Sequence, residues 1–428
     1  MTAAASSEKS GEQKANSANP ASIEKSDEQK AKSASQLNIA TLLMMTGVIM
    51  CVPTRTPMIL KIKKGDATST ARVMGLMSTL AAVIELFVNP VLAKLSDQLG
   101  RKLFLTVPPL VNAFLHMMVA VFPGNLSVQF ADRMISGSMI AAFMAPAHAA
   151  LADLYGKTPQ KFGAAASKLG TYVGIAAMLG PVIGARLGGA KSFAASALTF
   201  VAATLYVSSS LEETLPQEGR KNFKFSDVNP FAFVKLFQTG MLSKLTITGA
   251  LQSFGDYVNI YDINNLFMIK VLGYGQAQIG NFATTVGVSQ ILGGMGSAMV
   301  IKSIGLKTTT LFSNIMWAVG MLLMGSARNT AQAFTALVAF WTFGHQRATS
   351  VNSYLQKYGA EQGMGRAEIV GAQGNLIAYL KVMIPLFYSN LFAWATSGGR
   401  DMPGAPFAVI AALTAVSQMT FWAAAPQD

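Results

Sequence analysis

Long uncharged stretches constrain this 428-residue chain more than any other feature. Only 12% of its residues are charged, against about a quarter in soluble proteins, and the charges occur in clumps. The apolar runs between the clumps reach roughly 20 residues, the length of a helix that crosses the hydrocarbon core of a bilayer. A soluble protein of this size would need charges spread over its surface. The pattern therefore predicts an integral, multi-pass membrane protein whose main partner is the lipid bilayer.

About twelve runs have the length and composition of membrane-spanning helices. They cover residues 38–60, 70–93, 103–123, 127–152, 163–186, 192–210, 242–268, 276–301, 306–327, 330–356, 367–393 and 403–425. The longest polar interruption, 211–235, leaves six runs on each side. We therefore expect an all-α fold with two six-helix bundles, at 37–210 and 241–428, joined by a cytoplasmic loop at 211–240.

The first 36 residues are polar and repetitive. Glu-Lys-Ser at 8–10 recurs at 24–26, and Glu-Gln-Lys-Ala at 12–15 recurs at 28–31. Because they have almost no apolar side chains to bury, residues 1–36 are expected to be a disordered tail. They have neither the apolar core of a secretory signal nor the acid-poor composition of a transit peptide. An inert solvated arm is favoured over a regulatory tail.

The net charge of +13 raises the question of nucleic-acid binding. The Lys and Arg residues occupy short loops between the apolar runs rather than one patch, which is the pattern of cations at a membrane surface. We therefore expect no nucleic-acid partner. The single cysteine, Cys51, falls in the first apolar run, so no internal disulfide or Cys metal site can form and a buried structural thiol is expected.

The loop at 93–102 carries the most specific motif. It reads Ala-Lys-Leu-Ser-Asp-Gln-Leu-Gly-Arg-Lys, and such a compact group of charges has to lie in a turn at a membrane surface. It resembles the loop between the second and third helices of the major facilitator superfamily of transporters. The family's residues are present as Leu95, Asp97, Gly100, Arg101 and Lys102. Ala93 and Gln98 depart from the family's Gly and Arg.

Two further motifs extend the resemblance. In the family, the acid and Arg of this loop act with an acid at the cytoplasmic end of helix four, where this chain has Asp153. The resemblance implies a latch that holds the two halves together in the outward-open state; the alternative is that these residues only solvate the helix ends. The stretch 131–137, Ala-Asp-Arg-Met-Ile-Ser-Gly, resembles the helix-four pattern, and its Arg133 should face a cavity or a carboxylate.

A Gly-Pro motif in the fifth apolar run indicates which branch of the major facilitator superfamily the chain resembles. Gly180, Pro181 and Gly184, with Gly174 and Gly170, resemble the helix-five motif of facilitator antiporters, although Ala176 and Ala185 replace two of its glycines. Small residues allow close helix approach, and a proline introduces a kink on which the halves can rock. The motif favours the proton-coupled drug and tetracycline antiporter branch. Ordinary small-residue packing is the alternative.

The second half contains a weaker copy of the opening loop. The stretch around Gly305 can be laid over the opening loop with Gly305 opposite Gly100, but the positions of Asp97 and Arg101 then hold Lys302 and Leu306. The Lys and Arg balance across the short loops favours cytoplasmic termini, as the family resemblance does. The basic first outer loop, at 61–64, is the exception.

Several polar side chains fall deep inside the predicted spans, where they are expensive to bury and mark functional sites. By helical rise, Glu85, His116, Asp256, His345, Arg347 and Lys381 are central, while Arg55, Arg133 and Asp262 lie toward the outer end. The residues expected to form a substrate and proton cavity are Arg55, Glu85, Arg133, Asp256, Tyr257, Asn259, His345, Arg347, Gln373 and Lys381.

Each of these residues also has a structural interpretation. His116 is expected to be a hydrogen-bonded packing residue, and Asp262 can reach the outer headgroups. Arg347 and Lys381 can be neutralised by Asp256 within the second half. Because the central charges nearly cancel, the charge of the solute stays open, with a lean toward an anion or zwitterion.

Glu85 is the candidate for proton coupling. It is central and has apolar neighbours in the sequence, so burial favours its protonated form. The sequence shows no catalytic constellation, no His spacing for a metal and no phosphate-binding loop, so we expect neither an enzyme nor a cofactor. The chain is interpreted as a monomeric secondary transporter of a small polar or amphipathic solute, with proton-coupled, efflux-like antiport favoured. The alternatives are proton- or cation-coupled uptake of a metabolite or organic anion, and a non-transporting receptor or scaffold.

Overall fold

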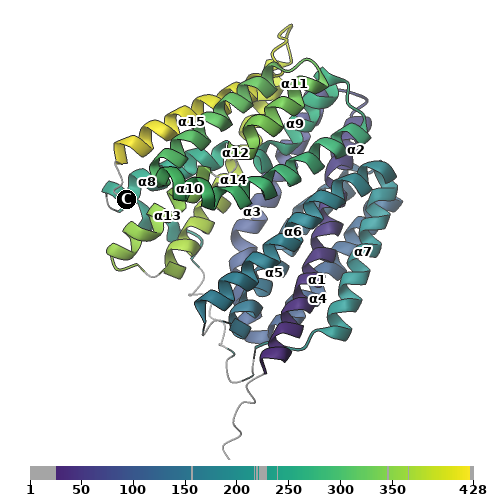
Figure 1. Ribbon diagram of the computed structural model, residues 1–428. Coiled ribbons are helices and arrows are strands. Elements are labelled where there is room, and N and C mark those ends of the chain that lie inside the picture. Colours follow the sequence, from purple (N-terminus) through teal and green to yellow (C-terminus); the bar gives the residue numbers. More distant parts are fainter. Residues whose placement is uncertain are drawn as a thin grey trace, which may run out of the picture.

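The computed structural model describes residues 26–155, 158–215, 217, 220, 229–238, 240–344, 347–364 and 366–424. Within these residues the chain forms helices joined by short turns, with no strand. Figure 1 shows two helix bundles, one from each half of the chain, inclined to one another. The all-α, two-bundle architecture expected from the sequence is therefore confirmed.

The first bundle contains six crossings, of which the first is made of two helices. The helices are α1 Asp27–Met50, α2 Val52–Ile62, α3 Ala67–Leu99, α4 Arg101–Val121, α5 Leu126–Tyr155, α6 Pro159–Leu187 and α7 Gly189–Ser210. α1 and α2 join at Cys51, where Pro53 occupies the start of α2. We call the side on which α1 begins the tail side, and the side on which α3 begins the far side.

The second bundle is less regular. Its elements are η3 Ala232–Phe237, α8 Gly240–Phe254, α9 Tyr257–Leu272, α10 Gln276–Ser326, α11 Thr330–Thr335, η4 Ala336–Trp341, α12 Thr342–Gly344, α13 Arg347–Glu361, α14 Arg366–Ala395 and α15 Ala405–Ala424. α10 contains two crossings that turn at Gly305, whose φ is 76°. Gly100 turns the first-half loop with a φ of 104°. Both glycines occupy backbone that other residues rarely adopt, as the weak internal repeat predicts.

Nine helical segments of the described residues are long and apolar enough to span a membrane. The predicted spans at 242–268, 276–301 and 330–356 are not among them. The first is broken between α8 and α9 at Gly255 and Asp256, and the last passes through the π-helical turn η4 before α13 begins. Such interruptions in membrane helices occur where the backbone lines a cavity or is buried in protein.

The tail is shorter than the sequence suggests. Residues 27–36 belong to α1 rather than to a disordered segment. Ser26 accepts a hydrogen bond from the Gln29 amide while the Gln29 side chain accepts one from the Ser26 amide, and this capping box starts the helix. Ser33 and Ala34 are buried against the bundle, which gives the polar segment a reason to be helical. Residues 1–25 lie outside the described residues.

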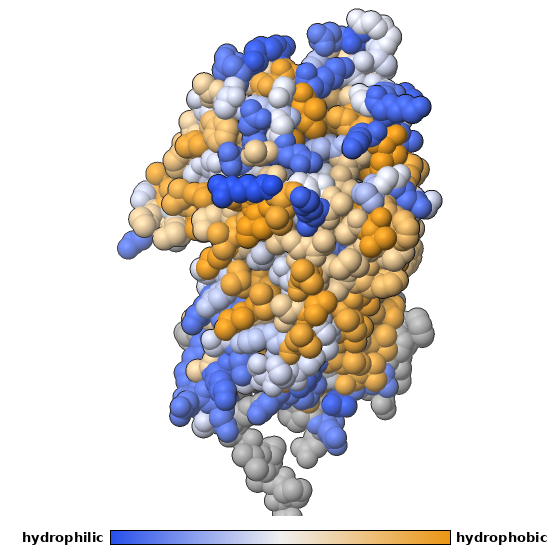
Figure 2. Space-filling view, turned by 90° about the vertical axis from the view of Figure 1, so that its right-hand side faces the viewer, coloured by the Kyte–Doolittle hydropathy of each residue, from blue (hydrophilic) through white to orange (hydrophobic). Residues whose placement is uncertain are grey.

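The bundle exteriors carry the apolar side chains that face lipid. Phe114, Leu198 and Leu205 are each more than 60% exposed, at 66%, 65% and 64%. Figure 2 shows a broad hydrophobic zone over one face, with hydrophilic residues gathered at its two ends. This distribution is that of a protein surrounded by hydrocarbon, because water would make such exposure unfavourable.

The two bundles meet mainly along two helix pairs, α3 with α14 and α6 with α10, with smaller contacts of α2 with α9 and α10 and of α3 with α9. Thr68 and Thr396 share a hydrogen bond of 3.3 Å, and the Thr284 hydroxyl donates to the Met178 carbonyl at 3.0 Å. These contacts lie in the far-side halves of the four helices. In Figure 1 the bundles diverge toward the tail side. The structure is therefore closed between the halves on the far side.

Candidate functional site

A cavity of about 490 Å³ lies between the two bundles. It is lined by residues of α1, α2, α3, α4, α5 and α6 of the first half and of α9, α10 and α14 of the second. Its apolar lining includes Met45, Val48 and Ile140, and its charged lining is Arg55, Glu85, Arg133, Asp262 and Lys381. The volume suits a drug-sized solute, and the mixture of apolar walls and a few charges suits an amphipathic one.

Arg55 on α2 is held by a buried carboxylate. Its Nη2 donates to Asp132 Oδ2 at 2.5 Å, and the Asp132 side chain is fully buried. The other Asp132 oxygen accepts from the Ser136 hydroxyl at 2.9 Å and lies 3.4 Å from His116 Nε2. The paired charges offset the large desolvation cost that either would have alone. Both oxygens of Asp132 therefore have partners within the first half. Arg55 Nη1, in contrast, has no hydrogen-bond partner in the described part of the chain.

His116 is the packing residue that its position predicts. Its Nδ1 lies 2.8 Å from the Ser196 hydroxyl and 3.5 Å from the Cys51 sulfur. Cys51 is buried, as expected for a structural thiol. Asp132 is not among the residues that the sequence marks for the site. Its neighbour Arg133 is, but adjacent residues on one helix point in different directions, so the position of one does not give the role of the other. The pair of Arg55 and Asp132 joins residues 77 positions apart, which no local pattern reveals.

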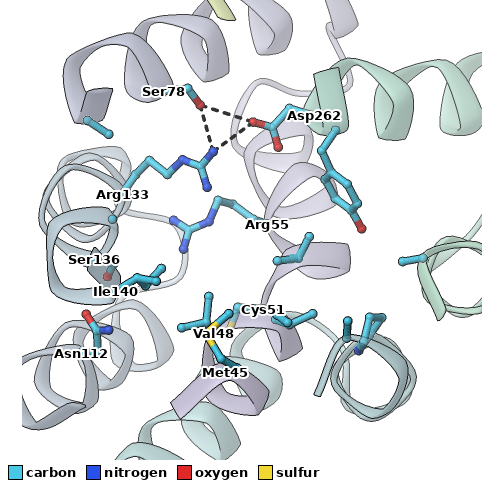
Figure 3. Close-up of a pocket in the computed structure, with 18 of the residues that line it drawn as sticks. Met45, Val48, Cys51, Arg55, Ser78, Asn112, Arg133, Ser136, Ile140 and Asp262 are labelled. Carbon is cyan, nitrogen blue, oxygen red and sulfur yellow. Dashed lines mark hydrogen bonds and ion pairs between the residues drawn. The ribbon is translucent and has the colours of Figure 1, made fainter. Parts of the chain in front are cut away.

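Arg133 on α5 connects the two halves at the far-side end of the cavity. Its Nη2 donates a hydrogen bond to Ser78 Oγ at 3.1 Å and lies 3.6 Å from Asp262 Oδ2 on α9. Ser78 Oγ in turn donates to Asp262 Oδ2 at 3.5 Å. Figure 3 shows this triangle beside the Arg55 guanidinium group. Asp262 is thus a bridging residue rather than one that only reaches headgroups.

Glu85 on α3 and Lys381 on α14 line the same cavity from opposite halves. Both side chains are partly exposed to it, and neither has a salt bridge or a side-chain hydrogen bond to another described residue. A Cβ added to Gly137 would overlap Glu85 Oε1, so the glycine provides the room that the carboxylate needs. These two groups are the charges in the cavity that remain available to a solute or a proton.

The loop at 93–102 forms a charge cluster within the first half. Arg101 Nη1 lies 2.6 Å from Asp97 Oδ1, and Arg101 Nε lies 3.3 Å from Asp153 Oδ2. Glu213, just after α7, accepts from the backbone amides of Arg101 and Lys102 at 2.9 and 3.1 Å. Leu95 is partly buried near the end of α3. Among the described residues none of these partners belongs to the second bundle, so no ion pair of this cluster connects the two bundles in this conformation.

Glu213 is a residue that the motif comparison missed. It caps the start of α4, where unpaired amides and the helix dipole favour a carboxylate. Gly100 leaves no room for a side chain there, because a Cβ would overlap Glu213 Oε2. The acidic pair Glu212 and Glu213 in the polar segment after the sixth span was a visible signal, but nothing in the linear order connects it with 93–102.

The Gly-Pro motif of α6 lies where three helices converge. A Cβ on Gly184 would overlap the Met50 carbonyl oxygen, and one on Gly180 would lie 3.2 Å from the Met50 amide nitrogen. On the other face, Pro181 lines the cavity, and a Cβ added to Gly280 of α10 would overlap the Pro181 carbonyl oxygen. Gly174 faces Ile291 of α10. The motif therefore lets α6 approach the first crossing and the second half at once.

The polar residues of the second half divide into several groups. Arg347 Nη2 donates to Asp256 Oδ1 at 2.9 Å and the guanidinium lies 4.1 Å from the Trp317 ring centroid. This ion pair lies within the second half and neither residue lines the cavity. Gln373 donates to Asn352 at 3.3 Å and is also outside the lining. The structure brings Arg55, Glu85, Arg133 and Lys381 together, and not Asp256, Arg347 or Gln373. His345 lies outside the described residues, as do the side chains of Tyr257 and Asn259.

Two helix bundles that enclose one central cavity with charges from both halves define the architecture of a secondary transporter. The sequence profile of the Major Facilitator Superfamily matches residues 37–380, most of the chain. The chain therefore belongs to this superfamily of transporters. This confirms the expected family and the expectation that the protein is a multi-pass membrane transporter rather than an enzyme.

Solved structures show the same fold at low sequence identity. The human organic anion transporter MFSD10 (TETRAN) is 17% identical, with a TM-score of 0.66 over 91% of this chain and 99% of that one. The nucleoside transporter NupG is 13% identical, with a TM-score of 0.72 over 92% and 99%. A bacterial homologue of the human lysosomal transporter Spinster, inward-facing and unoccupied, is 13% identical, with a TM-score of 0.65 over 94% and 100%. No curated protein matches the chain by sequence.

Proposed function

We propose that this protein is a proton-coupled antiporter that moves a small amphipathic solute by alternating access. The observation that carries the proposal is the available carboxylate of Glu85 in a cavity that both halves line. A carboxylate without a counter-ion can accept a proton or the positive group of a solute, but not both together. Mutually exclusive occupancy of one group couples two opposite fluxes when the two conformations interconvert only with that group occupied.

Two other carboxylates are less suited to this role, one behind the cavity wall and one in its lining. Asp132 is fully buried and held by Arg55, and Asp262 is held by Arg133 and Ser78. Protonation of either carboxylate would require breaking its existing ion pair with an arginine. Glu85 requires no such rearrangement, because it has no salt bridge or side-chain hydrogen bond to another described residue and Gly137 leaves room for its carboxylate.

The direction follows from the orientation that we propose from the loop charges, with cytoplasmic termini. In that orientation the structure is closed on the outer side, and the cavity faces the cytoplasm. The cluster of Asp97, Arg101 and Asp153 is then positioned to latch the halves when the tail side closes. One chain encloses the complete cavity, which supports a monomeric transporter.

Uptake of an organic anion is the second candidate. Three cations, Arg55, Arg133 and Lys381, line the cavity against two lining carboxylates, Glu85 and Asp262. The likeness to an organic anion transporter points the same way. In this case a proton or another cation would accompany the anion inward rather than exchange with the solute.

Proton coupling is tested in proteoliposomes that contain a pH-sensitive dye. Amino-acid zwitterions, organic anions and nucleosides are added in turn. We expect at least one of these solutes to drive protons across the membrane in the direction opposite to its own movement. Glu85→Gln should abolish that proton movement and weaken the exchange of labelled for unlabelled solute, because the same carboxylate takes the positive group of the solute. Glu361→Gln, an exposed acid on α13, is the matched control and should behave as the unmodified protein.

Three outcomes would contradict the proposal. Unchanged pH-gradient dependence in Glu85→Gln would remove Glu85 from coupling. Proton and solute moving in the same direction would establish the uptake candidate. Absence of flux for the whole panel in vesicles that contain folded protein would favour a receptor or scaffold.

A further inference from the structure

We propose that the cavity binds a zwitterionic solute, whose ammonium group pairs with Glu85 and whose anionic group pairs with Lys381. The inference rests on the proposed function and names its substrate class. It starts from the two charges of opposite sign that the cavity leaves without a protein partner in the described part of the chain. A solute with one charge would satisfy one of them and leave the other desolvated and unpaired, which is costly.

The helix faces place the two charges toward the same space. On α3, Ser78, Ala81, Ala82 and Glu85 all line the cavity, and their spacing puts them on one side of the helix. On α14, Lys381 and Pro385 line the cavity one turn apart. The two lining faces therefore oppose one another across the boundary between the halves.

The register of α3 and α14 places the charges at a similar depth. The antiparallel helices touch at Gly75, where a Cβ would overlap Ser389 and lie 3.0 Å from the Pro385 carbonyl oxygen. From this contact Glu85 lies ten residues along α3 and Lys381 eight residues back along α14. At the helical rise these offsets are about 15 Å and about 12 Å, both toward the tail side. The difference is smaller than one helical turn.

No ion pair joins Glu85 and Lys381 in the described part of the chain, and the bundles diverge toward the tail side in Figure 1. A solute that carries both charges can span the gap, with its apolar part against Met45, Val48 and Ile140. Such a solute contacts both halves and would draw them together on the tail side. The other lining charges do not compete for it equally, because Asp262 already has Arg133 and Arg55 already has Asp132.

The test uses unbranched ω-amino acids of four to twelve carbons, with the matched alkanoates and alkylamines, on the full-length protein in detergent micelles. Ligands that bind only the folded state raise the unfolding temperature. We expect at least one ω-amino acid to raise Tm by at least about 3 °C, and its one-charge relatives to raise it less. Glu85→Gln and Lys381→Gln should each remove the effect, while the controls Glu361→Gln and Lys270→Gln, both at exposed positions, should retain it.

A charge exchange makes the test independent of folding damage. Because an ω-amino acid can bind in the reverse direction, Glu85→Lys combined with Lys381→Glu should restore the Tm rise that each single change removes. A larger rise from an alkanoate or alkylamine, or no rise from any ω-amino acid, would overturn the proposal. Ligand-independent recovery of Tm in the double variant, without a ligand-induced rise, would show instead that the two residues pair directly.

Failure of this inference and failure of the proposed function are distinguishable. Zwitterion binding that depends on both residues, without any proton-linked flux in vesicles, would contradict antiport and leave the binding site standing. Proton-linked flux of a solute with one charge, without zwitterion binding, would leave antiport standing and remove the substrate class.

Discussion

At the scale of single residues, the charges of this protein divide into those that are neutralised and those that are available. Arg55 and Asp132 form a buried pair, and Arg133 and Asp262 form a bridge between the halves. The depth of a residue in its span is readable from sequence, because helical rise is constant. Whether a deep charge is paired is not readable, because its partner lies on another helix. Glu213 shows the same limit at the membrane surface.

Removing the Glu213 carboxylate should destabilise the start of α4. Glu213→Ala leaves the amides of Arg101 and Lys102 without their acceptor, and we expect the free energy of unfolding to fall by about 1–2 kcal/mol. The measurement is denaturant unfolding in detergent micelles. Glu212→Ala, at the exposed neighbouring position, is the control and should change the free energy by less than about 0.5 kcal/mol. Equal losses in the two variants would contradict the capping role.

At the scale of elements, glycines and helix breaks decide which helices can approach each other. The Gly-Pro pattern of α6 was visible in the sequence, and so was the correspondence of Gly305 with Gly100. The break between α8 and α9 and the π-helical turn η4 were not visible, since the sequence there continues as an apolar run with scattered polar residues. Arg347 sits between these two irregular spans and holds Asp256 at the break. Tertiary contacts have overridden the local preference for a continuous helix.

Two glycines of α6 should respond differently to the same substitution. A Cβ at Gly184 would overlap the Met50 carbonyl, whereas a Cβ at Gly170 meets nothing within 4 Å. Gly184→Ala should therefore separate α6 from the first crossing and lower the free energy of unfolding by about 1–3 kcal/mol. Gly170→Ala should leave it unchanged or raise it by up to about 1 kcal/mol through helix propensity. Denaturant unfolding measures both, and a loss at Gly170 as large as that at Gly184 would contradict the close approach.

At the scale of the whole molecule, the polar contacts between the halves found in the described residues lie on the far side. Thr68 with Thr396, Thr284 with Met178, and Arg133 with Asp262 belong to this set. The first-half cluster around Arg101 lies at the other side and has no ion pair with a described residue of the second half. Alternating access predicts a second conformation in which the far-side contacts separate.

A cross-link between Thr68 and Thr396 should trap the present conformation. The two hydroxyls lie 3.3 Å apart, and Cys51 is buried, so a Thr68→Cys/Thr396→Cys pair can be oxidised selectively. We expect oxidation to reduce solute exchange in proteoliposomes at least about tenfold, since a cycle needs both conformations, and reduction to restore it. The single cysteine variants are the controls. Full exchange in the cross-linked protein would show that the far side need not open.

The sequence by itself determined that the chain is an all-α membrane protein, how its crossings are divided, and that the loop at 93–102 marks a facilitator. These features depend on apolar length, on charge position and on glycine conformation, all of which are local. Only the tertiary structure decided that Asp132 neutralises Arg55, that Glu213 caps α4, and that Glu85 and Lys381 face one cavity without an ion-pair partner among the described residues. Pairing depends on which helices are neighbours, and a cavity depends on how two bundles meet. The long apolar runs ensure that the helices form in the membrane, but each helix is equally apolar toward lipid and toward another helix. Apolar length therefore does not determine which helices pack together, and it is the packing that decides which charges stay unpaired and available to a solute.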